Sequence, residues 1–360
     1  MHAGVHLSKG AFVHSFDGHN DVLLRLWRQG KDGVATFLEG DGKGQLDLPR
    51  ARGGGMVGGL YAIFAPSEHK SQANGPIESG TYDIPVPPGL ELTHAQRATL
   101  EMASLLFRIA ERSGGGVRIA RSVADIRVAK AAGAHAPVLH IEGCEALDGD
   151  LRMLDVLYAA GLRTLGPVWS RPNIFGHGVP FRFPSSPDTG DGLTDLGQAL
   201  IKRCNEMRVL IDLSHINEKG FWDVVKLSDA PLVATHSNAH ALCPASRNLT
   251  DKQLAAIRET GGLVGVNYAV SFLRKDGRRD ADTPLDTVVD HISYLIEHLG
   301  EDGIGLGSDF DGAMIPAGIG SAAGLPNLVA AMRKRQFSEP LVEKICFENW
   351  LRVLERTWDA

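Results

Sequence analysis

Histidine and carboxylate side chains recur along this sequence, each close to the end of a short apolar segment. Six of them stand out: His19, Asp21, Glu142, His215, His236 and Asp309. Imidazoles and carboxylates, with no thiolate among them, suit zinc or a similar divalent cation. Two such ions about 3.5–4 Å apart can jointly hold a hydroxide, because zinc lowers the pKa of a bound water to about 7. These residue types predict a hydrolytic site for zinc (Zn2+) or a similar divalent ion, in which one carboxylate can bridge two ions.

Each of these residues also has a plainer interpretation. His236 could be a core histidine, and Glu142 could cap a helix. The stretch from Asp309 to Gly312 could be an ordinary turn. Other catalytic motifs are absent, since the chain has neither a Gly-x-Ser-x-Gly elbow nor an HExxH helix. The repeated coincidence of such residues with strand ends favours the metal site.

Short apolar segments alternate with longer amphipathic stretches, which is typical of repeated βα units around a parallel sheet. We expect eight strands, at residues 11–16, 56–64, 137–141, 163–169, 209–213, 231–235, 262–267 and 304–307. Eight strands with helices between them favour a closed (β/α)8 barrel, the TIM barrel, over an open sheet. The candidate ligands follow the first, third, fifth, sixth and eighth strands, at the carboxyl ends where such barrels carry their active sites.

We expect a single catalytic domain over residues 1–360, because no linker or internal repeat interrupts this pattern. Long loops rich in Gly, Pro and polar residues are predicted at residues 65–90 and 170–192. Loops of this length in a compact domain are often functional. The second loop carries Asn173 and His177, and Asn173 is a candidate substrate-binding residue.

Composition and charge exclude several classes of protein. The formal net charge of −6 argues against a nucleic-acid partner. No apolar run is long enough to span a membrane, and the first residues lack the apolar segment of a signal peptide. The four cysteines have no CxxC spacing, which predicts reduced thiols in a cytoplasmic protein.

Six motifs follow one another along nearly the whole chain. They are Asp17-Gly-His-Asn-Asp21, Gly53-Gly-Gly-Met-Val-Gly-Gly59, Ile141-Glu-Gly143, Ile211-Asp-Leu-Ser-His215, Thr235-His-Ser-Asn238 continuing through Ser246-Arg-Asn248, and Gly307-Ser-Asp-Phe-Asp-Gly312. In this order they resemble the membrane dipeptidase (renal dipeptidase) family, including its soluble bacterial members. The resemblance implies that His19 and Asp21 bind one zinc, that His215 and His236 bind the other, and that Glu142 bridges the two.

The same resemblance implies roles for residues around the metals. Asp309 matches the family's acid/base residue, and Arg247 matches the arginine that holds the carboxylate of the substrate, for which a guanidinium fork is well suited. Family members often carry a histidine in a Leu-Thr-His stretch at the end of strand four, where this chain has Trp169. An indole donates one hydrogen bond but cannot become cationic. Trp169 is therefore expected to contact substrate, with oxyanion stabilisation resting more on zinc or on His177.

The expected activity is hydrolysis of dipeptides through a metal-bridging hydroxide, including dipeptides with a C-terminal D-residue, which the family tolerates. A related metal-dependent amidohydrolase acting on N-acyl amino acids or other small amides is the first alternative. A metal-binding protein without turnover is the second. The partner is then a small-molecule substrate, with no nucleic acid and no membrane, and the size of the barrel favours a homodimer.

Overall fold

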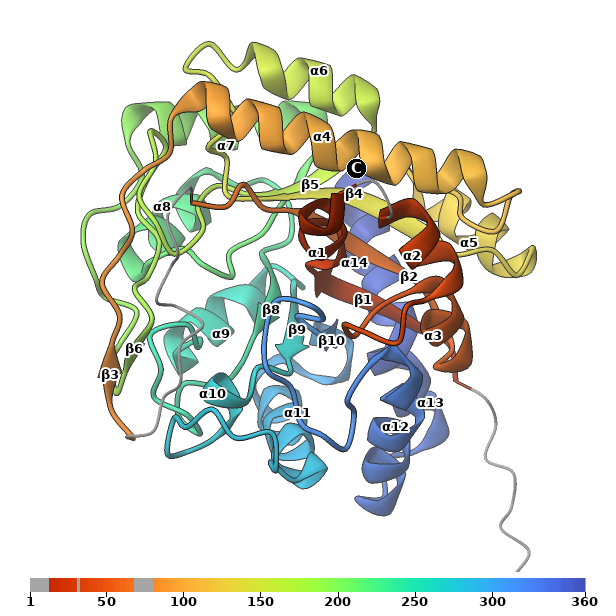
Figure 1. The fold of residues 1–360 in the computed structure, drawn as a ribbon. Helices are drawn as coiled ribbons and strands as arrows, with labels where there is room; N and C mark the ends of the chain where they lie inside the picture. The colour runs from red at the N-terminus through yellow and green to blue at the C-terminus, as the bar shows by residue number, and fades with distance from the viewer. Residues whose placement is uncertain (1–12, 31–32, 68–79, 360) are drawn as a thin grey trace, which may run out of the picture.

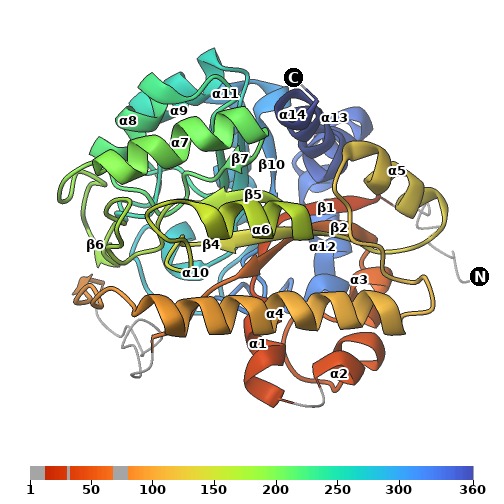
Figure 2. The same cartoon turned by 90° about the horizontal axis from the view of Figure 1, so that it is seen from above.

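The computed structural model describes residues 13–30, 33–67 and 80–359. Eight parallel strands form one sheet in the order β7-β5-β4-β2-β1-β10-β9-β8. A parallel bridge from Asp212, just after β7, to Val233, the first residue of β8, joins the two edges of this sheet. The sheet is thus a nearly closed barrel with helices around it, which confirms the predicted (β/α)8 fold (Figures 1 and 2).

The barrel strands agree with most of the predicted segments. They are β1 Ser15–Asn20, β2 Met56–Ile63, β4 Ala136–Glu142, β5 Leu162–Gly166, β7 Leu210–Ile211, β8 Val233–Ser237, β9 Leu263–Asn267 and β10 Ile304–Gly307. On β4, Val138, His140 and Glu142 alternate along the strand and so share one face. Glu142 is the last residue of β4, at the carboxyl end of the barrel.

The first predicted strand, 11–16, was wrong in position, although its first two residues lie outside the described part of the chain. The strand runs on through Asp17 to Asn20, a polar stretch whose composition suggests a turn. The Asp17 carboxylate accepts hydrogen bonds from the backbone N (2.7 Å) and hydroxyl (2.8 Å) of Ser308, which lets this polar stretch be buried in the sheet. His19 consequently lies within β1 and not after it.

Three other strands end two or three residues away from the predicted position, among them β7, which ends at Ile211 and not at residue 213. β8 extends to Ser237, so His236 lies inside the strand. β5 ends at Gly166, so Trp169 lies in the loop beyond it and not on the strand. Polarity alone does not mark where these strands end, because β8 continues through the polar residues His236 and Ser237 whereas β5 ends at Gly166, before the apolar Val168 and Trp169.

Helices cover the outside of the barrel (Figure 2). They are α1 Val22–Gln29, α2 Gly33–Glu39, α3 Leu48–Gly53, α4 Leu92–Arg112, α5 Val123–Ala131, α6 Arg152–Ala160, α7 Asp195–Met207, α8 Glu218–Leu227, α9 Asp251–Glu259, α10 Val270–Leu273, α11 Leu285–Leu299, α12 Leu325–Lys334, α13 Glu339–Glu343 and α14 Asn349–Trp358, with a π-helical turn at Lys344–Glu348. In α4, Ala95, Ala98, Met102, Leu106 and Ile109 are buried at helical spacing. None of the described helices is long and apolar enough to cross a membrane.

A plug of apolar side chains fills the barrel at the amino ends of the strands. Leu210, Val233 and Leu263, the first residues of β7, β8 and β9, share one core cluster with Trp350 of α14. The Trp350 indole donates to the carbonyl of Leu306 at 2.9 Å. A Cβ at Gly305 of β10 would collide with this indole, so the glycine makes the room that the plug requires. We therefore expect substitutions in this plug to lower stability.

The two predicted loops meet over the barrel. The first carries β3 (Tyr82–Asp83) and the second carries β6 (Arg182–Phe183), and these short strands pair antiparallel. Residues 68–79 of the first loop lie outside the described residues. All four cysteines are free and buried, as predicted: Cys144, Cys204, Cys243 and Cys346.

Candidate metal centre

One carboxylate oxygen lies at the centre of the imidazole groups. Glu142 Oε1 is 3.5 Å from His19 Nε2, 2.9 Å from His215 Nε2 and 3.3 Å from His236 Nε2. The two nitrogens His215 Nε2 and His236 Nε2 are themselves 3.2 Å apart. These side chains come from β1, the end of β4, the segment after β7 and β8, and only the closed barrel brings them together.

Two further carboxylates lie close to His19. Its Nε2 is 3.5 Å from Asp21 Oδ2, and ligand atoms of His19, Asp21 and Asp309 lie within 4.8 Å of one another. Asp309 adopts a left-handed backbone conformation, with φ of 59°, which Asp tolerates better than most residues. A Cβ at Gly312 would collide with the carboxylates of both Asp21 and Asp309, so this glycine lets the loop close onto them.

Burial sets the charge balance of this cluster. It raises the pKa of Glu142 well above its usual value and lowers the pKa values of His215 and His236 well below theirs. Burial also lowers the pKa of His19, but the neighbouring Glu142 and Asp21 carboxylates outweigh it and raise that pKa to about 10. The raised pKa of His19 shows that the carboxylates around this ring favour a positive charge beside them, which a bound metal ion would supply.

The donor set fits a pair of divalent cations. Both ring nitrogens of His19 are buried without a hydrogen-bond partner among the described residues. Such orphaned groups are rare in folded proteins, because each costs about 1–3 kcal/mol. Ligation by a metal ion would satisfy Nε2, which points at both Glu142 and Asp21. Imidazole and carboxylate donors without thiolate agree with zinc, among other divalent ions.

Arg247 is almost completely buried and contacts the backbone of the segments that carry His215 and His236. Its Nη1 donates to the Ser214 carbonyl and to the Ser237 hydroxyl (3.2 Å), and its Nη2 donates to the His236 carbonyl (3.0 Å). Its Nε has no partner among the described residues. Nε and the second hydrogen of Nη2 are thus left to donate a pair of hydrogen bonds to a bound anion.

Trp169 lies beside the cluster, with its ring centroid 5.8 Å from that of His215 and 4.7 Å from that of Phe64. Asn173 is used within its own loop, because its Nδ2 donates to the Pro167 carbonyl (2.8 Å) and its Oδ1 accepts from the Phe175 backbone N (2.9 Å). Its substrate-binding role stays a prediction.

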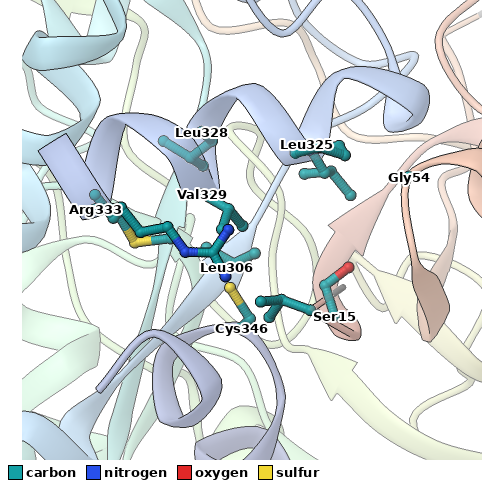
Figure 3. A pocket seen from close by; sticks show the side chains of 11 residues that line it. Ser15, Gly54, Leu306, Leu325, Leu328, Val329, Arg333 and Cys346 are labelled. Carbon is teal, nitrogen blue, oxygen red and sulfur yellow. The ribbon is translucent and has the colours of Figure 1, made fainter. Parts of the chain in front are cut away.

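Two cavities lie elsewhere. His177 lines one of about 570 Å3 together with Pro172 and Arg182, beside the β3–β6 pair. The other, of about 160 Å3, lies between β10 and α12 and is lined mainly by apolar side chains such as Leu306, Leu325 and Val329 (Figure 3). None of the six predicted ligand and acid/base residues lines either cavity. The candidate site is therefore identified by its converging side chains and not by either of these cavities.

Sequence reasoning gave no role to the groups that support these histidines. Ser170 Oγ lies 2.9 Å from His215 Nδ1, and Thr235 Oγ1 lies 2.9 Å from His236 Nδ1. Asn267 Nδ2 donates to Asp309 Oδ2 at 3.0 Å. Thr235 directly precedes its histidine in the sequence, and this adjacency was the one available signal. Ser170 and Asn267 are distant in sequence from the residues that they contact.

The chain matches the family model for membrane dipeptidase (peptidase family M19) over residues 11–360. It is 51% identical, over 72% of its length and 95% of the relative's, to an uncharacterized protein in the pqqA 5′ region of Klebsiella pneumoniae. Among solved structures it is similar to the dipeptidase AC, a metallopeptidase of family M19, with 51% identity, a TM-score of 0.94, and 97% of this chain and 100% of that chain covered.

A second solved structure is a metallopeptidase from Rhodobacter sphaeroides, liganded with a phosphinate mimic of the dipeptide L-Ala-D-Ala. It is also 51% identical, with a TM-score of 0.95 over 96% of this chain and 100% of that chain. The matched length, the fold and the converging histidines and carboxylates agree with one another. The chain therefore belongs to the membrane dipeptidase family, peptidase family M19, and is a metallo-dipeptidase.

Proposed function

We propose that this chain hydrolyses dipeptides at a centre of two zinc ions. His19 and Asp21 would hold one ion, His215 and His236 the other, and Glu142 would bridge them. The observation that carries the proposal is the position of Glu142 Oε1, within 3.5 Å of the Nε2 atoms of three histidines. When bound, the ions would polarise the scissile carbonyl and lower the pKa of the attacking water.

Arg247 binds the free carboxylate of the substrate in this proposal. Its Nε and the second Nη2 hydrogen supply the two parallel hydrogen bonds that a carboxylate accepts. The bonds from Nη1 and Nη2 to the Ser214 and His236 carbonyls fix the guanidinium against the strand that carries His236. Anchoring the carboxylate at this point holds the scissile bond at a set distance from the histidines, and such positioning lowers the barrier to attack.

Asp309 transfers the proton. Burial, followed by the nearby Asp21 carboxylate, raises its pKa to about 6. A carboxyl group with a pKa near neutrality can accept a proton from the attacking water and return it to the departing amine. The Asn267 amide holds Oδ2 at 3.0 Å and leaves Oδ1 for the proton. Trp169 and Phe64 form an apolar wall beside His215 and exclude water from that side.

The substrate class also draws support from the Rhodobacter sphaeroides relative, whose ligand mimics a dipeptide with a D-residue at its carboxyl end. We propose the same tolerance for this chain. A metal-dependent hydrolase of N-acyl amino acids would need the same ions and the same carboxylate anchor. It would differ in having no site for a free α-amino group.

The test is a substrate panel on zinc-reconstituted enzyme. It contains L,L- and L,D-dipeptides, their carboxyl-amidated forms and N-acetyl amino acids. We expect turnover of dipeptides and a strong preference for a free carboxylate, which Arg247→Ala abolishes while Arg203→Ala, at an exposed arginine on α7, preserves it. Preferential turnover of N-acetyl amino acids would replace the dipeptidase proposal with the amidohydrolase alternative. Full zinc occupancy without any turnover would support a metal-binding protein.

We further propose that residues 1–360 work as one catalytic domain and that two chains pair, while a cytoplasmic location stays a prediction. The proposal of one domain is supported by the pairing of β1 with β10, because strands from the N-terminal and C-terminal parts of the chain then belong to one sheet. Limited proteolysis and the sedimentation of purified protein test the domain and the pairing. Separately stable fragments would contradict the first, and a monomer at micromolar concentration would contradict the second.

A further inference from the structure

Asp212 is a buried carboxylate for which the proposed reaction has no use. It lies at the end of β7 with 3% of its surface exposed. Its Oδ1 accepts from the Ser214 backbone N (3.0 Å), the Ser214 hydroxyl (2.5 Å) and the Thr235 backbone N (2.8 Å). Its Oδ2 accepts from the Thr235 hydroxyl at 2.6 Å. Burying a carboxylate is costly unless it is hydrogen-bonded in this way, which points to a role.

These contacts fix the direction of each hydrogen bond. A carboxylate oxygen can only accept, and a threonine hydroxyl has a single hydrogen to donate. The hydrogen of Thr235 therefore points at Asp212 Oδ2. The Ser214 hydroxyl also lies 3.3 Å from the Thr235 oxygen, but its hydrogen is donated to Asp212 Oδ1. The Thr235 oxygen can therefore only accept in its contact with His236 Nδ1, which lies 2.9 Å away. Nδ1 of His236 consequently carries the ring hydrogen, and Nε2 carries a free lone pair.

The free lone pair faces the candidate metal centre, since His236 Nε2 lies 3.3 Å from Glu142 Oε1. The opposite tautomer would direct a hydrogen at the place where a cation must bind. His215 differs, because its Nδ1 meets the Ser170 hydroxyl, and the direction of that bond is not set by a carboxylate bound to the same hydroxyl. The carboxylate–hydroxyl–imidazole series belongs to His236.

We propose that Asp212 and Thr235 are positioning residues that lock His236 in its Nδ1–H tautomer and so prepare Nε2 to bind a metal ion. The inference rests on the proposed function only in taking His236 as a ligand. The tautomer itself belongs to the chain alone and can be observed without metal. Supporting partners of metal-binding histidines commonly account for about 10–100-fold in metal affinity.

The first variant removes the hydroxyl at nearly constant shape. Thr235→Val leaves His236 Nδ1 without an acceptor, whereas Thr235→Ser keeps the hydroxyl and should restore wild-type behaviour. Thr164→Val is the matched control, because the buried Thr164 hydroxyl contacts His140 Nδ1 at 2.8 Å, and His140 is not a proposed ligand. We expect Thr235→Val to weaken zinc binding about 10–100-fold in competition with a chelator, and both other variants to stay within about twofold.

The second variant reverses the series. In Asp212→Asn the amide oxygen must take the Oδ1 position, where two backbone N–H groups point, so the amide NH2 faces Thr235. The threonine oxygen then accepts from this amide, and its hydrogen turns toward His236 Nδ1. That ring nitrogen must become the acceptor, which moves the ring hydrogen to Nε2. Asp212→Asn is therefore expected to bind zinc more weakly than Thr235→Val.

The readout that a merely structural role would not move is the tautomer. Nitrogen NMR of metal-free protein labelled with 15N-histidine distinguishes protonated from unprotonated ring nitrogens. We expect Nδ1–H at His236 in wild type and Thr235→Ser, and Nε2–H in Asp212→Asn. An unchanged Nδ1–H signal in Asp212→Asn would overturn the proposal that Asp212 and Thr235 set the tautomer of His236. Wild-type protein that shows the Nδ1–H tautomer but binds no zinc would support the proposed tautomer and would contradict the proposed function instead.

Discussion

At the carboxyl ends of the barrel strands, buried side chains are polar and several have no partner of their own; at the amino ends they are apolar and closely packed. Both ring nitrogens of His19 lack partners among the described residues, whereas Trp350 is completely buried and its indole nitrogen is bonded. Barrels of this class keep catalysis and stability at opposite ends. Substitutions at the carboxyl ends should therefore change activity and leave stability nearly unchanged. Substitutions at the amino ends should lower stability and leave activity nearly unchanged.

The largest effect is expected at the carboxyl end, for Asp309→Asn. Loss of a general acid/base lowers kcat by about 10²–10⁴-fold. Asn tolerates the left-handed backbone at this position, and the buried charge disappears, so the free energy of unfolding should be unchanged or slightly higher. Steady-state kinetics and chemical denaturation of the metal-loaded variant test both statements. A kcat within threefold of wild type would refute the assigned role.

Trp350→Ala at the amino end is the mirror-image experiment. Removing this indole leaves a cavity against the barrel glycines and should cost about 3–5 kcal/mol of unfolding free energy. Activity per folded molecule should stay within about twofold, because Trp350 lies in the plug and contacts none of the proposed ligands. Trp358→Ala, in the same helix but only partly buried, is the control and should cost less. Equal losses of unfolding free energy in the two variants would contradict the larger contribution expected of Trp350.

The smallest expected effect is on the pH dependence of the free energy of unfolding. Burial lowers the pKa of His135, which precedes β4, to about 4, so this ring is neutral in the folded protein. Below pH 6.5 the unfolded chain takes up the proton first, and stability falls as the pH drops from 6.5 toward 4, by up to about 1.4 kcal/mol per pH unit. His135→Gln should flatten this slope and leave the pH dependence of stability above 6.5 as it is in wild type. A slope identical to that of wild type would contradict this assignment.

Much of the barrel follows from local sequence, and the reason is visible in its strands. β2 is apolar throughout and β9 is apolar up to its last residue, Asn267, so composition alone marks them as buried strands. β1 escaped prediction because Asp17 and His19 are polar and are buried by partners almost three hundred residues away in the sequence, such as Ser308. Only contacts across the closed sheet make such a strand stable.

The candidate site divides in the same way. His19, Glu142 and His236 could be predicted because each is the last or next-to-last residue of its strand, and parallel strands bring their carboxyl ends to one mouth. The series from Asp212 through Thr235 to His236 could not, since it depends on the pairing of β7 with β8 that the Asp212–Val233 bridge records. The substrate-binding role of Asn173 stays a prediction, because its described hydrogen bonds to Pro167 and Phe175 do not test a contact with substrate.

The most direct test of the metal centre is a count of zinc ions per chain by elemental analysis after reconstitution and desalting. It should be made on wild type, His19→Ala and His236→Ala. The proposed centre predicts two ions in wild type and one in each variant, with each remaining ion held by the opposite pair of ligands. A wild-type chain that retains one ion or none, or two ions retained in both variants, would contradict it.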